Sequence, residues 1–177
     1  MTVIMDSTHH ARAVTEVLET QAGAGTVALL SDLADDGLLG RQTTLRITLF
    51  LAQLGLSIFS IAGLCESGRA EGLNGVEMAA NRMGNSDVAK DAVCLAFVRS
   101  LLDNPDVPLR NDLQRMSDAG YRQDAILEVI AQVNLHLSLV NMVAAIEPGG
   151  VTSSIGIANT SAYPRLIAPS KPAGPPG

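Results

Sequence analysis

Residues 90–146 read KDAVCLAFVRSLLDNPDVPLRNDLQRMSDAGYRQDAILEVIAQVNLHLSLVNMVAAI and decide the fold. The spacing of apolar residues predicts a helix that is capped by Ser86 or Asp87 and continues to Leu102. The NPDVP run at 104–108 must end this helix, because proline lacks a backbone N–H and excludes the residue before it from helical geometry. The stretch therefore predicts helices that are separated by short breaks.

Two more helices are predicted downstream of that break. Leu109, Leu113 and Met116 lie at i, i+4 and i+7 of a short amphipathic helix that closes at Gly120. A last helix starts near Gln123 or Asp124. It places one apolar stripe along its length, formed by Ile126, Ile130, Val133, Leu137, Val140 and Ala144.

Glycines divide the chain upstream of this stretch in the same way. The predicted helices are His9–Gln21, ended by the glycines at 23 and 25, then Val27–Asp35, Arg41–Cys65 and Val76–Met83, which ends at Gly84. Hydrophobic residues make up 47% of the chain and aromatic residues only 3%. Such a core consists of aliphatic side chains, which favours packed helices over a β-sandwich.

We therefore expect an all-α, single-domain protein, since 177 residues suffice for one real core. Its parts are an N-terminal helix and turn at 1–25, a helical domain at 26–146 and a flexible tail at 147–177. Six of the eight prolines lie in that tail, where helical periodicity stops.

Charge and cysteine content exclude several classes of protein. A formal net charge of −6, with Lys90 and Lys171 as the two lysines, leaves no basic footprint for nucleic acid. Two cysteines cannot form a disulfide framework, and the N-terminus lacks a signal-peptide layout, so a cytoplasmic location is expected. Metal-binding and nucleotide-binding motifs are missing, and we expect no metal and no cofactor.

The uncharged run Ile47–Cys65 is nineteen residues long, which is enough to span a bilayer. Arg46 precedes it, Glu66 and Arg69 follow it, and neither end has a Trp or Tyr belt. These flanks favour a helix that is buried in the protein core and does not enter a membrane. A membrane-spanning helix is the alternative.

The order of features in residues 90–146 resembles the C-terminal half of the alkylhydroperoxidase D-like (carboxymuconolactone decarboxylase) superfamily. The shared features are a proline break, an Ala-Gly-aromatic turn and an Ile-Leu-Glu-Val-Ile run after an acidic helix start. The active site of that family is a Cys-x-x-Cys-x-x-x-His run, with Gly-Leu eight residues after the His. If Gly72-Leu73 is that pair, the His position falls on Leu64 and the cysteine positions fall on Ser57 and Ser60.

The resemblance covers about residues 26–146 and implies a helical bundle that assembles as a homo-oligomer, a trimer or hexamer. The proton-relay positions of the peroxide-reducing members fall on Leu45 and Phe59, so every member of the relay is replaced. Serine cannot form the thiolate that attacks a peroxide. Ser57 and Ser60 are interpreted as helix-interior hydroxyls bonded to a carbonyl one turn back, or as the polar contacts of a surviving pocket.

Three other residues bear on the site. Cys65 and Cys94 could form a relocated redox pair, but buried free cysteines are more often core filler. His136 lies between Asn134 and Asn141, and this polar island suggests a buried hydrogen-bond network or a pocket wall. His136 as a general base is the alternative.

These observations favour a family member that has lost thiol peroxidase chemistry and binds a small apolar molecule. If it is an enzyme, it transforms that molecule without redox, as a lyase or isomerase, with Ser57, Ser60 and His136 as the candidate catalytic residues. Leu45, Phe59, Leu64, Asn134 and Asn141 are then the expected pocket residues. The alternatives are an alkylhydroperoxidase-type oxidoreductase that uses Cys65 and Cys94, and a non-catalytic oligomeric scaffold whose tail, at 153–157, docks a partner.

Overall fold

The computed structural model describes residues 3–103 and 110–146, and within those ranges it contains eight helices and no strand. The all-α expectation is thereby confirmed. The helices are α1 (Val3–Glu19), α2 (Gln21–Asp36), α3 (Arg41–Gln53), α4 (Ile61–Ala70), α5 (Gly75–Arg82), α6 (Ala89–Asp103), α7 (Arg110–Asp118) and α8 (Gln123–Ile146). The expected proline break at 104–108 and the expected tail at 147–177 lie outside the described residues.

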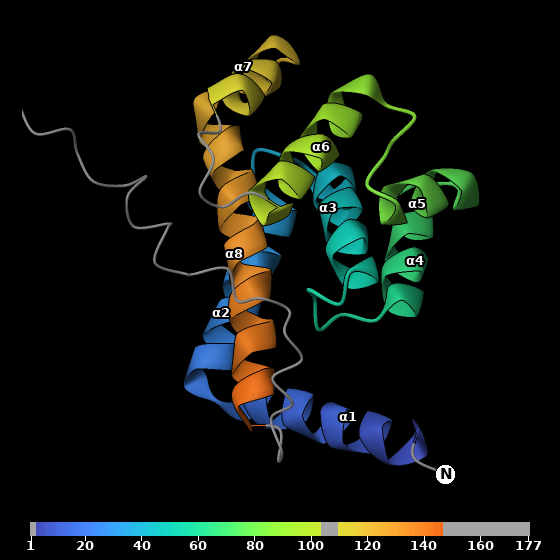
Figure 1. Cartoon of the computed structure of the whole chain (residues 1–177), viewed down its shortest axis with the longest axis vertical. Coiled ribbons are helices and arrows are strands. Elements are labelled where there is room, and N and C mark those ends of the chain that lie inside the picture. The colour runs from blue at the N-terminus through green and yellow to red at the C-terminus, as the bar shows by residue number, and fades with distance from the viewer. Residues whose placement is uncertain (1–2, 104–109, 147–177) are drawn as a thin grey trace, which may run out of the picture.

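The long helix α8 runs the length of the molecule with α2 beside it (Figure 1). Helix α1 crosses one end of this pair, and α7 lies at the other end. Helix α3 lies centrally, with α6 on one side and α4 and α5 on the other. Helix α3 therefore separates α8 from the α4–α5 pair.

Three apolar clusters hold these layers together. The largest joins α3, α6, α7 and α8 around Phe50, Phe97 and Met116. A second joins α1, α2 and α8 around Val17 and Leu139. A third, around Leu49, Leu64, Leu73 and Met78, joins α3, α4 and α5. Burial of each such side chain contributes about 2 kcal/mol, so helix packing dominates the stability of the fold.

The predicted single helix Arg41–Cys65 is wrong, because the chain breaks it after Gln53. Gly55 adopts the left-handed conformation, with φ 74°. The N–H of Leu56 donates to the carbonyl of Leu51 at 2.8 Å, which is the bond that closes a Schellman motif. The run at 47–65 is thus two helices joined by a loop, and the continuous span on which the membrane alternative depended does not form.

Among the described residues, one helix, α8, is long and apolar enough to cross a membrane. This judgement rests on its length and composition alone. This is weak evidence, since the core helix of a soluble protein passes the same test. Here α8 packs against five other helices, α1, α2, α3, α6 and α7.

The predicted turn at Gly23 and Gly25 is also wrong, because both glycines lie inside α2. The chain bends three residues earlier, where the Thr20 hydroxyl caps α2 by accepting from the N–H of Gly23 at 3.0 Å. A Cβ on Gly23 would lie 2.0 Å from the carbonyl oxygen of Val17. Gly23 thus permits a close approach of α1 and α2, and the expected segment end at residue 25 falls within a helix.

Three other helix ends match their sequence signals, whereas α1 begins at Val3 and α2 at Gln21, each six residues before the predicted start. Gly84 and Gly120 adopt φ 74° and φ 87° directly after the ends of α5 and α7. Helix α8 begins at Gln123, as predicted. Its Glu128 reaches back to the turn between α2 and α3, where its carboxylate accepts from the N–H groups of Leu38 and Leu39 at 2.8 and 3.2 Å. This contact fixes the start of α3 against α8.

Candidate functional site

A cavity of about 360 Å³ lies between α2, α3, α4 and α8. Four of the residues predicted from the sequence line it, namely Leu45, Phe59, Leu64 and His136. Leu45 comes from α3, Phe59 from the loop before α4, and Leu64 from α4. The Phe59 ring meets the His136 ring edge to face, with centroids 5.7 Å apart and the planes at 85°.

Ser57 and Ser60 do not line this cavity, and their hydroxyls are not bonded to carbonyls one turn back. Ser60 is the N-cap of α4, and its hydroxyl accepts from the N–H of Gly63 at 3.1 Å. The Ser57 hydroxyl accepts from the N–H of Phe59 at 3.2 Å. The helix-interior interpretation was wrong because it assumed one helix through 41–65, whereas these serines lie in the break and stabilise the start of α4.

The three polar residues of α8 do not form one network. His136 is 1% exposed, whereas Asn141 is exposed to solvent. The Asn134 side chain donates to the carbonyl of Ile130 at 3.0 Å and lines a separate groove of about 590 Å³ along α2 and α8. Residues 134 and 141 are seven apart and share a helix face, while residue 136 is rotated by about 200° from residue 134.

Cys65 and Cys94 are both free and lie in different parts of the core. Cys65 packs against the third cluster, between α3 and α4, and Cys94 is buried in the first cluster, on α6. Burial raises the pKa of the Cys94 thiol to about 12. A thiol of that kind is protonated near neutral pH and does not act as a nucleophile.

Three polar residues that were not predicted from the sequence line the same cavity as His136. They are Thr44 and Thr48, one turn apart on α3, and Gln132, one turn before His136 on α8. All three are at most 6% exposed. The available signal was a pair of polar side chains at i and i+4 on each of the two helices, which places each pair on one helix face.

Hydrogen bonds join these residues across the helix interface. The Gln132 amide nitrogen donates to the Thr44 carbonyl at 3.1 Å and to the Thr48 hydroxyl oxygen at 3.3 Å. The Thr48 hydroxyl lies 2.9 Å from the Thr44 carbonyl and 3.4 Å from Nε2 of His136. Burial lowers the pKa of His136 to about 4, so the imidazole is neutral at pH 7.

An ion pair lies at the rim of the cavity. Nε of Arg41 lies 2.9 Å from the carboxylate of Glu71, the residue that ends α4. The neighbouring Gln42 side chain donates to the backbone carbonyl of Glu71 at 2.7 Å. Together these contacts tie the start of α3 to the end of α4.

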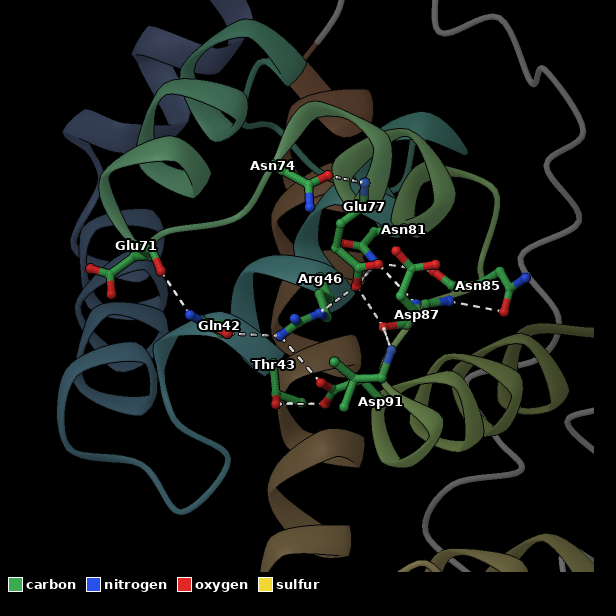
Figure 2. A network of polar contacts seen from close by, with 12 residues as sticks. Gln42, Thr43, Arg46, Glu71, Asn74, Glu77, Asn81, Asn85, Asp87 and Asp91 are labelled. Atoms are coloured by element: carbon green, nitrogen blue, oxygen red, sulfur yellow. Dashed lines mark hydrogen bonds and ion pairs between the residues drawn. The ribbon is translucent and has the colours of Figure 1, made fainter.

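A second polar group is centred on Arg46 and joined to this rim through Gln42, whose side-chain oxygen accepts from the Arg46 guanidinium at 3.4 Å (Figure 2). Its guanidinium is 2.9 Å from the Glu77 carboxylate and 3.2 Å from the Asp91 carboxylate, and all three side chains are buried. Burial acts to raise the pKa of Glu77. Hydrogen bonds from Ser86, the backbone N–H of Asp87, Asn81 and Arg46 outweigh it and lower that pKa to about 2. This network joins α3, α5 and α6, and the sequence analysis did not anticipate it.

The fold and the cavity define a class: an all-helical protein with an apolar cavity whose wall carries buried polar side chains. Among the described residues, no group of three or more His, Cys, Asp or Glu side chains could hold a metal ion. Comparisons with protein-family models, with curated proteins and with solved structures found no match to this chain.

Proposed function

We propose that this chain binds a small, mostly apolar molecule in the α2–α3–α4–α8 cavity and performs no thiol redox chemistry. On this proposal it is a redox-silent relative of the alkylhydroperoxidase D-like superfamily, as the resemblance in residues 90–146 implies. The observation that carries the proposal is the cavity itself. Its wall combines apolar side chains, among them Leu45, Phe59 and Leu64, with polar ones, and small-molecule sites combine these two kinds of group.

The volume of the cavity indicates the size of the group that it can bury. About 360 Å³ accommodates a molecule of one or two rings. The neutral His136 and the hydroxyls of Thr44 and Thr48 supply polarity without net charge. An uncharged ligand therefore loses the least solvation free energy on entering.

The binding of toluene tests this proposal. Isotope-labelled leucine methyl groups report the contact, and we expect saturable shifts at Leu45 and Leu64 in the native protein. Leu64→Phe fills part of the cavity and should weaken binding at least about tenfold. The control is Val76→Phe, at a side chain that is 75% exposed on α5, and it should bind as the native protein does. Shifts that never saturate, or that survive Leu64→Phe unchanged, would contradict the proposal.

The oxidoreductase alternative has a separate test. Purified protein supplied with an organic hydroperoxide and a dithiol reductant should show no turnover, because Ser57 and Ser60 are backbone caps and the Cys94 thiol is buried and protonated. A control for the assay is the double variant Ser57→Cys, Ser60→Cys. Turnover by the native protein that is lost in Cys65→Ser would overturn the redox-silent proposal.

A further inference from the structure

The side-chain amide of Gln132 has one chemically allowed orientation. Its nitrogen lies 3.1 Å from the Thr44 carbonyl oxygen, which can only accept a hydrogen bond. A flipped amide would set two acceptor oxygens against each other. Both amide protons are thus directed at Thr44 and Thr48, and Oε1 of Gln132 is left buried without a partner among the described residues.

The same reasoning fixes the tautomer of His136. The one hydroxyl proton of Thr48 is directed at the Thr44 carbonyl, 2.9 Å away, so the Thr48 oxygen acts as the acceptor toward its other neighbours. Nε2 of His136, at 3.4 Å from that oxygen, must then carry the ring proton. Nδ1 is left as a bare acceptor, and it too is buried with no partner among the described residues.

Two residues of the cavity wall therefore each carry an unpartnered acceptor, Oε1 in Gln132 and Nδ1 in His136, and both atoms are buried within the wall. A ligand in the cavity reaches them once either side chain rotates toward it. The hydroxyl of Thr44 is the third buried atom of the wall that lacks a described partner. Leaving such groups unpaired costs about 1–3 kcal/mol each, and a ligand that pairs with them recovers this free energy. The arrangement of donors and acceptors thus selects for the chemistry of the ligand.

We infer that the ligand is a neutral molecule with a hydroxyl group, a phenol or an alcohol, whose O–H donates to Gln132 or His136. This inference rests on the proposed function and deepens it. The Thr44 hydroxyl supplies a donor for the oxygen of the ligand. A carboxylate is disfavoured, because it would set its lone pairs against both acceptors, and the Arg41–Glu71 ion pair at the rim supplies no net positive charge to offset its desolvation.

Four ligands of similar shape test the inference: p-cresol, toluene, 4-methylanisole and 4-methylbenzoate. Transfer from water to an apolar cavity favours toluene and 4-methylanisole over p-cresol, so tighter binding of p-cresol reports a hydrogen bond in the cavity. We expect p-cresol to bind at least about tenfold more tightly than 4-methylanisole, which is a difference of ~1.4 kcal/mol. We expect 4-methylbenzoate to bind most weakly at pH 7.

The outcomes separate the two proposals. If toluene and 4-methylanisole bind as tightly as p-cresol, the donor requirement is wrong while the cavity remains a binding site. If none of the four ligands gives saturable shifts, the proposed function fails and the inference fails with it.

A variant and a spectroscopic measurement provide independent checks. Gln132→Met keeps the length of the side chain and removes the acceptor, so the preference for p-cresol should shrink severalfold while toluene still binds. In the native protein, nitrogen-15 spectra should show His136 with the proton on Nε2, and p-cresol should shift the Nδ1 resonance. A proton on Nδ1 in the unliganded protein would overturn the assignment of donors and acceptors.

Discussion

Ser60 illustrates how a residue at an expected catalytic position acquires a structural role. Its backbone is extended, with φ −72° and ψ 139°, and its hydroxyl accepts from the third residue along. This is the geometry of an N-cap, in which a side-chain oxygen satisfies one of the unpaired N–H groups at the start of a helix.

Ser60→Ala should therefore lower the free energy of unfolding by about 1 kcal/mol, as measured by urea denaturation. Ser60→Asp should retain most of the stability, because a carboxylate caps equally well. A role in binding would give the opposite pattern: unchanged stability with loss of toluene binding in Ser60→Ala.

The lowered pKa of His136 makes the free energy of unfolding depend on pH. Its pKa is about 4 in the folded chain against 6.5 for a free histidine, so between these values the unfolded chain binds a proton that the folded chain does not. Stability therefore falls as the pH decreases from 6.5 toward 4, by up to roughly 3 kcal/mol from this group alone. We expect His136→Gln to flatten the slope of unfolding free energy between pH 7 and pH 5.

Glu77 changes the free energy of unfolding at lower pH than His136 does, so the contributions of the two residues can be measured separately. Its pKa is lowered from 4.5 to about 2, so its contribution is complete above pH 4.5 and is lost as the pH falls toward 2. An unaltered slope between pH 7 and pH 5 in His136→Gln would show that His136 titrates normally in the folded protein.

At the scale of elements, the junction of α1 and α2 depends on one glycine. Gly23 and Gly25 both lie in α2, but only Gly23 faces the end of α1. Nothing lies within 4 Å of a Cβ built on Gly25.

The two glycines form a matched pair for mutation. Gly23→Ala should destabilise the protein by about 2 kcal/mol or more, because its methyl group would collide with the backbone of Val17. Gly25→Ala should stabilise it by roughly 0.5–1 kcal/mol through helix propensity. Thermal unfolding of both variants measures the difference, and equal effects would contradict the close packing of α1 on α2.

At the scale of the whole molecule, α2, the turn that follows it and α8 leave apolar side chains exposed. Leu29, Leu38 and Leu127 are 54%, 62% and 58% exposed. Leu29 and Leu38 line the groove of about 590 Å³ between the two helices. The family resemblance implies a trimer or hexamer, and we propose that this surface contributes to the assembly.

Sedimentation equilibrium at micromolar concentration, without detergent, tests the assembly. We expect a species of three chains or more, which Leu127→Glu shifts toward monomer. The control is Val76→Glu, at a position that is 75% exposed on α5, and it should leave the mass unchanged. A monomeric native protein would contradict the proposed assembly.

Much of the helical layout was decided by residues close together in the sequence. Gly84 and Gly120 follow the ends of α5 and α7, and α8 starts at Gln123, because a left-handed glycine or a polar start acts on the adjacent turn alone. The all-α class follows from the same local periodicity.

The tertiary structure alone decided the roles of other residues. The pair Gly23 and Gly25 predicts a turn, but Gly23 instead allows two helices to approach. The partners Thr44 and Gln132 are 88 residues apart, and no local pattern specifies that they meet. The sequence determined where helices form, because those signals act within one turn. The packing of distant helices determined the cavity and its hydrogen bonds, because such contacts exist only once the chain is folded.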